Sequence, residues 1–588
     1  MATSMTKSAA TPAGGADSGG LSHRQIMTIL SGLMLGMFLA ALDQTIVATA
    51  IRTIGDDLHG LEAQAWVTTA FLITSTIATP LMGKLSDIFG RKPLFMIAIS
   101  LFVLGSALCG LSQSMYMLAA FRAFQGIGAG GIMPLALAII GDIIPPRERA
   151  RYQGYFMAVF ATSSVLGPVI GGFFAGRGSI IGISGWRWIF YINVPIGIFA
   201  LIVVEAVLKL DHIPRKSRID WNGAAMLVLG LVPLLIVAEQ GRTWGWGSGG
   251  AFACYVVGAI GLIAFVFVER HMGDAALLPL RLFRSDVFAL GSIQATIVGL
   301  GMFGGIASIP LYLQIVKGAS PTKSGLLILP LVAGIMVASL ASGQITSRTG
   351  RYKIFPVLGS VFMVVGMGLM TQISADTPLS TTDVYMLVFG LGLGMNMQSI
   401  VLAMQNAVDP RDMGVATSSV TFFRQVGGSL GTAIFLSILF SRAGTEIKSA
   451  FGDAQKTAAF QQAAKAHPKE LPKLSGGSGA LNDTAFLKGL DKTLAHPFLV
   501  GFSNAMDTVF LVGAGVLVIA FFVSIFMREV PLRTVSGQQA AREAVAAAAA
   551  ADSAPAVGDS VDANGAVAVR DVDAAGASEP PPDDQTRS

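Results

Sequence analysis

Three charged side chains lie inside apolar stretches, where charged residues are least expected: Asp43, Arg122 and Arg424. An unpaired charge in an apolar surrounding is costly, and charged residues within membrane segments commonly bind protons, ions or substrates. An apolar surrounding favours the neutral carboxyl form, so Asp43 could load and release a proton or bind a cationic substrate. The alternative is a carboxylate near a helix end that is solvated or holds a structural partner.

A glutamine accompanies each of the two arginines. Gln125 lies one helical turn after Arg122 on roughly the same face, and Gln425 directly follows Arg424. Because a guanidinium group stays charged, Arg122 can bias the protonation of a nearby carboxyl group or change partners as protons move. The alternative is a structural arginine that binds carbonyl oxygens at a helix end. We expect the two glutamines to line a substrate cavity.

The composition excludes a soluble protein. Of 588 residues, 53% are hydrophobic and 13% are charged, and the mean hydropathy is +0.65. A soluble protein has about 25% charged residues. A net charge of +5 without a basic stripe argues against nucleic-acid binding. Cys109 and Cys254 fall inside apolar runs and are interpreted as packing residues.

A helix needs about 20 mainly apolar residues to span a bilayer. The sequence contains fourteen such runs, which predict an all-α integral membrane protein because open strands leave unpaired backbone groups in lipid. The runs cover residues 26–49, 65–83, 93–112, 115–141, 152–175, 188–209, 221–240, 250–269, 287–314, 322–343, 354–373, 383–405, 412–440 and 502–526.

Lysine and arginine accumulate in the loops on one side of the predicted membrane. With the N-terminus inside, the inner loops hold about 17 basic residues and the outer loops about six. The bias predicts a multi-pass protein of the plasma (cytoplasmic) membrane with both termini in the cytoplasm.

The glycine-rich segments do not indicate a nucleotide site. Residues 126–131 (GIGAGG) formally match the dinucleotide fingerprint, but they lie inside an apolar span without a preceding strand. Glycines there permit close helix packing instead. We find no phosphate-binding Gly-Lys-Ser/Thr loop, metal-ligand cluster or nucleophile constellation in the sequence. We therefore predict that the protein is not an enzyme and uses no nucleotide, cofactor or metal.

One internal repeat divides the chain. GKLSDIFGR (83–91) and GQITSRTGR (343–351) both place Gly-Arg seven residues after the first glycine, with eight predicted spans between them. Two six-helix halves with two inserted helices fit this spacing. The predicted divisions are a flexible leader (1–24), an N-terminal half (25–210), the inserted helices with a linker (211–280), a C-terminal half (281–530) with a long outer loop (441–501), and a disordered tail (531–588).

Several motifs resemble one family, the major facilitator superfamily, over about residues 25–530. GKLSDIFGRK (83–92) is similar to its signature loop between helices 2 and 3. The further matches are FRAFQGIGAGG (121–131) to its helix-4 motif, VLGPVIGG (165–172) to its antiporter motif, and ALDQTIVATAI (41–51), WRWIFYINVPIG (186–197) and FFRQVGGSLGTA (422–433) to its fourteen-helix drug:proton antiporters.

The resemblance implies roles for particular residues. It assigns Arg122 to proton coupling, and we place Asp43 and Arg424 in the same set. Gly83, Asp87, Gly90 and Arg91 belong to the signature loop, where a carboxylate and an arginine can clasp neighbouring helices and form a gate. The alternative is ordinary anchoring at the cytoplasmic face. In the second copy of the repeat Ser347 replaces the acid, which predicts a weaker clasp.

The helix-5 motif, Gly167, Pro168, Gly171 and Gly172, is associated in this family with export. A kink at the proline and close packing at the glycines are sufficient physical reasons for it. We count these residues with the gate, as part of a conformational switch.

These observations predict a proton-coupled exporter of amphipathic or cationic organic compounds, driven by the proton gradient and functional as a monomer in lipid. An exporter of a lipid, siderophore or self-made antibiotic would share the fold, and the long outer loop is its only support in the sequence. A membrane sensor or enzyme on a transporter-like scaffold has no such support. Glu205, Glu239 and Asp507 lie near span ends and are interpreted as solvated.

Overall fold

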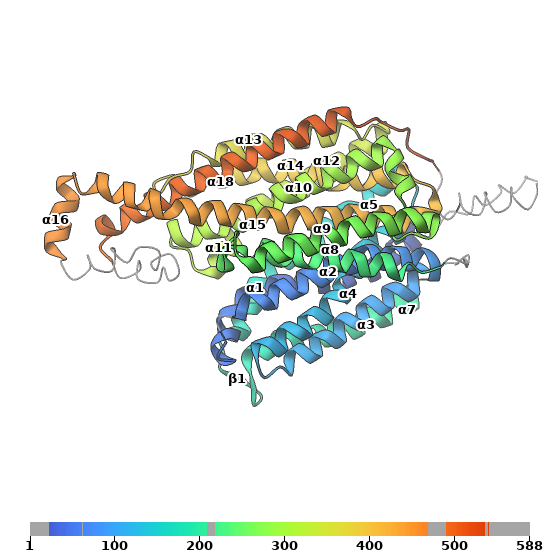
Figure 1. Ribbon diagram of the computed structural model, residues 1–588, viewed down its shortest axis with the longest axis horizontal. Helices are drawn as coiled ribbons and strands as arrows, with labels where there is room; N and C mark the ends of the chain where they lie inside the picture. Colours follow the sequence, from blue (N-terminus) through green and yellow to red (C-terminus); the bar gives the residue numbers. More distant parts are fainter. Residues whose placement is uncertain (1–22, 61–62, 209–217, 468–489, 535–538, 540–588) are drawn as a thin grey trace, which may run out of the picture. The chain divides into compact units, whose positions relative to one another are not determined.

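The structure, a computed structural model, describes residues 23–60, 63–208, 218–467, 490–534 and 539 (Figure 1). Four stretches of the predicted divisions lie outside the described residues: 1–22 of the leader, 209–217 around the start of the linker, 468–489 of the outer loop, and nearly all of the tail. The first helix begins at His23, two residues inside the predicted leader.

Long helices make up the described part of the chain. They are α1 (His23–Asp57), α2 (Gln64–Phe89), α3 (Arg91–Gly110), α4 (Met115–Ile143), α5 (Pro146–Ala175), α6 (Trp188–Tyr191), α7 (Asn193–Val207), α8 (Trp221–Trp244), α9 (Gly249–Met272), α10 (Asp286–Leu311), α11 (Pro321–Leu327), α12 (Leu329–Thr349), α13 (Ile354–Met370), α14 (Leu379–Asn406), α15 (Met413–Ala454), α16 (Ala458–Ala466) and α18 (Lys492–Phe526).

Short elements connect these helices. The 3₁₀-helices are η2 (Gly185–Arg187), η3 (Gly273–Ala275), η4 (Leu280–Arg284) and η6 (Pro410–Asp412), and η5 (Tyr312–Val316) is a π-helix that continues α10. Strands β1 (Ser179–Ile180) and β2 (Ile183–Ser184) form an antiparallel hairpin that the sequence analysis did not predict. Gly182 and Ile181 have positive φ between the two strands, as a tight hairpin turn requires.

Thirteen helical segments of the described residues are long and apolar enough to cross a membrane. The remaining predicted run, 354–373, corresponds to α13, an apolar helix of 17 residues. The chain is therefore a helical membrane protein, and the predicted count of fourteen agrees once this shorter helix is included.

Local sequence explains where several helices begin and end. Ser114 and Ser248 accept hydrogen bonds from the first turns of α4 and α9, as N-cap residues do. Pro146 occupies the first turn of α5, where its missing N–H is not needed. Gly90 has a φ of 99°, which lets the chain turn sharply from α2 into α3.

Glycine stripes on α4 and α14 reveal the internal repeat in three dimensions. An added Cβ at Gly126 or Gly130 would collide with the backbone of α2, and one at Gly128 with α3. The equivalent positions of α14 behave alike, because Gly390 and Gly394 contact α12 and Gly392 contacts α13. Close backbone approach through small residues is the packing mode expected in lipid, where apolar side chains gain little from association.

Separate hydrophobic clusters hold the two repeats. One cluster joins residues of α1–α5 and α7, including Leu30, Phe95 and Ile139. A larger cluster joins α10, α12–α15 and α18, and it also takes in Leu231 and Phe265 from α8 and α9. The two inserted helices therefore pack into the core of the C-terminal repeat.

The predicted long loop at 441–501 is partly helical. Helix α15 continues to Ala454, α16 follows, and α18 begins at Lys492, ten residues before the predicted span. At 42 residues α15 is about 63 Å long, which is roughly twice the hydrocarbon thickness of a bilayer. Figure 1 shows α16 beyond the ends of α15 and α18. We call this the α16 end of the chain, and the end that carries residues 83–92 the signature end.

Candidate functional site

A buried polar cluster surrounds Asp43, whose side chain is fully shielded from solvent. Arg122 Nη1 lies 2.6 Å from Asp43 Oδ2 and forms an ion pair. Gln125 and Asn193 donate to the other carboxylate oxygen, Oδ1, over 3.0 and 2.8 Å. Both amides also donate to Ser106 Oγ, over 3.0 and 2.8 Å. Four helices, α1, α3, α4 and α7, thus meet at one carboxylate.

The surroundings of Arg122 explain how its charge is tolerated. Its Nη1 also donates to Gln125 Oε1 over 2.7 Å, and its guanidinium carbon lies 4.0 Å from the centre of the Phe71 ring. A cation over an aromatic face is favourable and more so where water is excluded. Arg122 Nε, by contrast, is buried without a hydrogen-bond partner. This arrangement leaves Arg122 able to exchange partners.

Protonation of Asp43 would change this cluster. An ionised Asp43 balances the charge of Arg122, whereas a neutral Asp43 would leave a buried guanidinium group without its counter-ion. An unpaired buried charge is strongly unfavourable. Proton binding therefore has the capacity to rearrange α1 relative to α4.

Asn193 and Ser106 complete the cluster, and the sequence analysis missed both. Asn193 lies in the WRWIFYINVPIG segment, where a lone amide in an apolar run was the available signal. Ser106 is a small hydroxyl among apolar residues of α3 and carries no comparable signal. Gln125 is fully buried in the same cluster, so its predicted position in a substrate cavity stays a prediction.

The signature loop contacts the beginning of α15. Asp87 accepts hydrogen bonds from the backbone N–H groups of Gly414 and Val415, over 3.1 and 3.0 Å. These groups belong to the first turn of α15, where a carboxylate is favoured by the helix dipole. Asp412, the N-cap residue of α15, does not cap the helix itself and instead pairs with Arg281 at 2.8 Å. Asp87 on α2 supplies the missing cap.

Arg91 contacts three side chains at the same end of the protein. Its Nη2 lies 2.6 Å from Asp87, its Nε lies 2.7 Å from Asp142 of α4, and its Nη1 donates to Ser86. The predicted Asp87–Arg91 clasp is thus formed, and it includes a third residue, Asp142. Gly83 permits this approach, because an added Cβ would collide with Ser418 and lie 2.8 Å from the Gly414 oxygen.

Two arginines at the start of α5 contact the C-terminal repeat at the same end. Arg147 donates to the carbonyl oxygens of Ser347 and Arg348, in the last turn of α12, over 3.1 and 3.0 Å. Arg149 is fully buried and donates to Gly141, Ile144 and the side chain of Gln405. Burial lowers the pKa of Arg149 to about 10, so it remains charged at neutral pH.

The helix-5 motif lies between α1 and α11. Added Cβ atoms at Gly167 and Gly171 would collide with Thr45 and Thr49, which follow Asp43 on α1. On the other side, Gly172 faces Thr322, and a Cβ at Gly325 would lie 3.0 Å from Pro168. The motif therefore presses α5 against the helix that carries Asp43 and against the C-terminal repeat at once.

Arg424 and Gln425 have different surroundings. The Oε1 of Gln425 accepts from Thr79 of α2 over 3.3 Å, so it bridges the two repeats. Arg424 is 8% exposed, and its guanidinium group has no hydrogen-bond or ion-pair partner within the described ranges. Among the described residues, neither Asp43 nor another carboxylate pairs with Arg424, and the predicted proton-coupling role of Arg424 stays a prediction.

The three carboxylates near span ends differ from one another. Glu205 is exposed and pairs with Lys92 at 3.0 Å, as expected of a solvated residue. Glu239 is half-buried on α8. Asp507 is partly buried on α18, and its Oδ1 is shielded from solvent without a hydrogen bond. The expectation of solvation thus suits Glu205 best.

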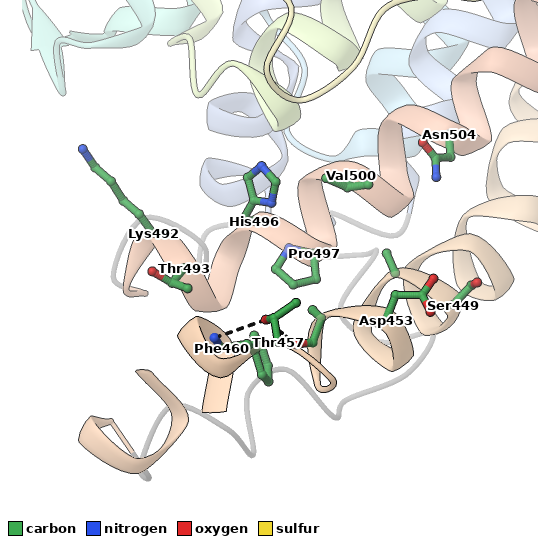
Figure 2. A pocket seen from close by; sticks show the side chains of 12 residues that line it. Ser449, Asp453, Thr457, Phe460, Lys492, Thr493, His496, Pro497, Val500 and Asn504 are labelled. Carbon is green, nitrogen blue, oxygen red and sulfur yellow. Dashed lines mark hydrogen bonds between the residues drawn. The ribbon is translucent and has the colours of Figure 1, made fainter. Parts of the chain in front are cut away.

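A cavity of about 590 Å³ opens at the α16 end (Figure 2). Its walls come from the end of α15, from α16 and from the start of α18, and include Phe460, Pro497 and Val500. Its rim is polar, with Asp453, Lys492 and His496. His496 Nε2 also lies 3.2 Å from Asp376 in the loop before α14. The cavity thus combines an apolar floor with charged edges.

Repeated helix groups, a buried charge cluster and small-residue helix contacts between the repeats define a class of protein. Two such repeats are typical of secondary transporters. Across the described ranges, no group of three or more His, Cys, Asp or Glu side chains is placed to hold a metal ion.

The chain belongs to the Major Facilitator Superfamily, whose family model matches residues 33–432. Multidrug resistance protein 3 of Bacillus subtilis is 33% identical over 511 residues, which cover 86% of this chain and 96% of that protein. Multidrug transporter protein MdtP of the same organism is 34% identical over 417 residues, covering 71% of this chain and 76% of the relative. An MFS-type transporter of Mycobacterium tuberculosis is 38% identical over 505 residues, which cover 86% of this chain and 70% of that protein.

Solved structures share the fold. The proton:xylose symporter XylE aligns with a TM-score of 0.55 at 15% identity, covering 88% of this chain and 99% of that one. A bacterial homologue of the human lysosomal transporter Spinster aligns with a TM-score of 0.54 at 17% identity, covering 87% and 100%. The protein is therefore a membrane transporter of this superfamily and not an enzyme, and the two Bacillus subtilis relatives are named for multidrug transport and multidrug resistance.

Proposed function

We propose that the protein exports amphipathic or cationic organic compounds across the plasma membrane in exchange for protons, with both termini in the cytoplasm. The observation that carries the proposal is the fully buried Asp43–Arg122 pair at 2.6 Å. A buried ion pair within the membrane has a large desolvation cost, and charged residues in such positions commonly serve transport. The names of the relatives support the substrate class, and the proton gradient supplies the energy.

The coupling step begins at Asp43. When the carboxyl group takes a proton from outside, its attraction to Arg122 weakens and α1 is released from α4. Thr45 transmits the change to α5, since its hydroxyl donates to the Ser163 oxygen over 3.1 Å. Release of the proton to the cytoplasm restores the ion pair and returns the transporter to its starting state.

The signature end forms the cytoplasmic gate in this scheme. The Asp87 contact to α15 and the Arg147 contact to α12 each join an N-terminal helix to a C-terminal one. Both contacts must break before the two repeats separate at the cytoplasmic face. The protein is expected to complete this cycle as a monomer, without a cofactor.

The test uses proteoliposomes that contain the full chain and an imposed proton gradient, with the cationic dye ethidium as the transported probe. Asp43→Asn should abolish gradient-driven dye movement, because the amide cannot exchange a proton. Asp453→Asn, at an exposed carboxylate of α15, is the matched control and should transport normally. Wild-type dye transport by a correctly inserted Asp43→Asn protein would overturn the assignment.

A second candidate function is export of a lipid, siderophore or self-made antibiotic, and the cavity at the α16 end favours it. Its apolar floor and charged rim suit an amphipathic molecule that leaves the membrane. Because α15 is roughly twice as long as the hydrocarbon region is thick, we infer that this cavity lies outside that region. The α16 end then receives the cargo after it has crossed the membrane between the two repeats.

Filling the cavity separates the two functions. Val500→Trp would occupy part of the cavity that Val500 lines, and Val518→Trp, at an exposed position of α18 that does not line the cavity, is the control. Fluorescent-lipid export that fails in the tryptophan variant while ethidium transport persists would favour the second candidate. Unchanged export of both probes would leave the multidrug function as the better account.

A further inference from the structure

Two carboxylates of the inserted helices are buried together at the signature end. Glu269 of α9 is 0% exposed, and Asp220, the N-cap residue of α8, is 2% exposed. Each uses one oxygen in a hydrogen bond to the backbone. Glu269 Oε2 accepts from Leu278 N over 2.8 Å, and Asp220 Oδ1 accepts from Gly223 N over 2.7 Å.

The second oxygen of each carboxylate has no partner. Glu269 Oε1 and Asp220 Oδ2 are both shielded from solvent without a hydrogen bond. The two atoms point to one place, because a Cβ added to Gly223 would meet Asp220 Oδ2 and would lie 2.8 Å from Glu269 Oε1. Two unpartnered acceptors that converge in this way need a donor between them.

The neighbouring charges leave room for one additional positive charge. Lys84 of α2 is 7% exposed and attracts Glu269, while its Nζ donates to the Asp274 backbone oxygen over 2.9 Å. Arg281 is already paired with Asp274 and Asp412. In the described part of the chain, Asp220 and Lys84 act on the charge of Glu269, and Asp87, Arg281 and Asp412 act on that of Lys84. Because Arg281 is held by two other carboxylates, Lys84 is the cation of this set that is left to balance Glu269.

We propose that Asp220 and Glu269 share one proton in a hydrogen bond between their free oxygens, which makes the inserted helices a proton-binding site separate from Asp43. The proton satisfies both acceptors and neutralises the charge that Lys84 leaves unbalanced. Loss of the proton places two like charges side by side and favours separation of α8 from α9 at this end. Because Lys84 belongs to the signature loop and Arg281 holds Asp412 beside α15, the site lies next to the gate residues.

Infrared difference spectroscopy in H₂O and D₂O tests the proposal directly, since only a protonated carboxyl group gives a C=O stretching band that shifts in D₂O. The full chain in lipid nanodiscs should lose the same band in Glu269→Gln and in Asp220→Asn. The double variant should lose no more intensity than either single variant, because one proton is shared. Asp43→Asn should retain the band.

A variant that keeps both carboxylates guards against simple misfolding. Gly223→Ala inserts a methyl group between the two oxygens and should remove or shift the band. Gly250→Ala on α9, where an added Cβ meets nothing within 4 Å, is the matched control and should leave it unchanged. A band that survives in Glu269→Gln, in Asp220→Asn and in Gly223→Ala overturns the proposal. A double variant that loses twice the band intensity lost by either single variant overturns it as well. Thermal stabilisation of the wild type by Na⁺ or Mg²⁺ without any such band would indicate a cation site and overturn it too.

Discussion

Asp87 of the N-terminal repeat caps the first turn of α15 in the C-terminal repeat. Its carboxylate accepts a hydrogen bond from the backbone N–H of Gly414 over 3.1 Å. Arg147 forms the complementary contact with the last turn of α12. A carboxylate thus meets a helix N-terminus on one side of the signature end, and a guanidinium group meets a helix C-terminus on the other. Both contacts match the sign of the helix dipole. The two repeats thus make corresponding contacts between a side chain and a helix end, with a negative side chain in one contact and a positive side chain in the other.

Asp87→Asn should open the cytoplasmic gate more often. The amide loses the charge that favours the helix N-terminus, and a partly buried contact of this kind is worth up to about 2 kcal/mol. We expect about tenfold faster labelling of a cysteine at position 425 by a charged thiol reagent in inside-out vesicles, after Cys109 and Cys254 are replaced by serine.

The opposite contact provides the comparison. Arg147→Met should produce a similar increase in labelling, because it removes both the charge and the donor to α12. Glu148→Gln changes the adjacent exposed charge and should have no effect. Equal labelling rates in Asp87→Asn and the wild type would show that the dipole contact does not hold the gate.

Gly83→Ala should impair transport through a collision rather than through charge. Its Cβ would meet the Ser418 side chain and lie 2.8 Å from the Gly414 oxygen. Ser418→Gly removes the side-chain obstacle but leaves the Gly414 oxygen, so it should restore only part of the dye transport, whereas Ser418→Gly alone should behave nearly as the wild type. A double variant that transports no better than Gly83→Ala would locate the defect elsewhere.

The sequence predicts the membrane helices and the main charged residues because these depend on local composition. The fourteen apolar runs correspond to helices in the structure, and Asp43 stands out since lipid excludes charge. The same reasoning indicated an amphipathic helix over 444–466, where the structure has the end of α15 and α16. It overlooked the hairpin at 179–184, whose strands are two residues long. Short strands have no hydropathy signal.

Contacts between residues far apart in the chain could not be predicted from the sequence, because they depend on how the helices pack. Nothing about Asp412 suggests that Arg281 holds it and that Asp87 replaces it as the cap of α15. Ser106 and Asn193 are ordinary polar residues until four helices bring them to Asp43. The Asp220–Glu269 pair arises from two inserted helices whose ends meet, 49 positions apart in the chain.

Asn193→Leu should lower both the stability of the protein and its dye transport. Asn193 donates to Asp43 over 2.8 Å, so the leucine removes one of the hydrogen bonds that stabilise the buried carboxylate. A hydrogen bond to a charged group is worth roughly 1.5–3 kcal/mol, so the thermal unfolding temperature should fall. Asn504→Leu, at an exposed position of α18, is the control and should leave the unfolding temperature unchanged. Wild-type stability and transport in Asn193→Leu would show that this hydrogen bond does not support the cluster.

Arg122→Met and Arg424→Met should affect stability in opposite directions. Removing Arg122 leaves Asp43 as a buried unpaired carboxylate, which costs about 3–5 kcal/mol when ionised. Arg424 has no partner among the residues that the structure describes, so replacing it removes a desolvated charge and should raise the thermal unfolding temperature. Both variants should lose dye transport if Arg424 serves the transport cycle. Normal transport by a stabilised Arg424→Met protein would assign this arginine no role in the cycle, and destabilisation would mean that its charge is compensated after all.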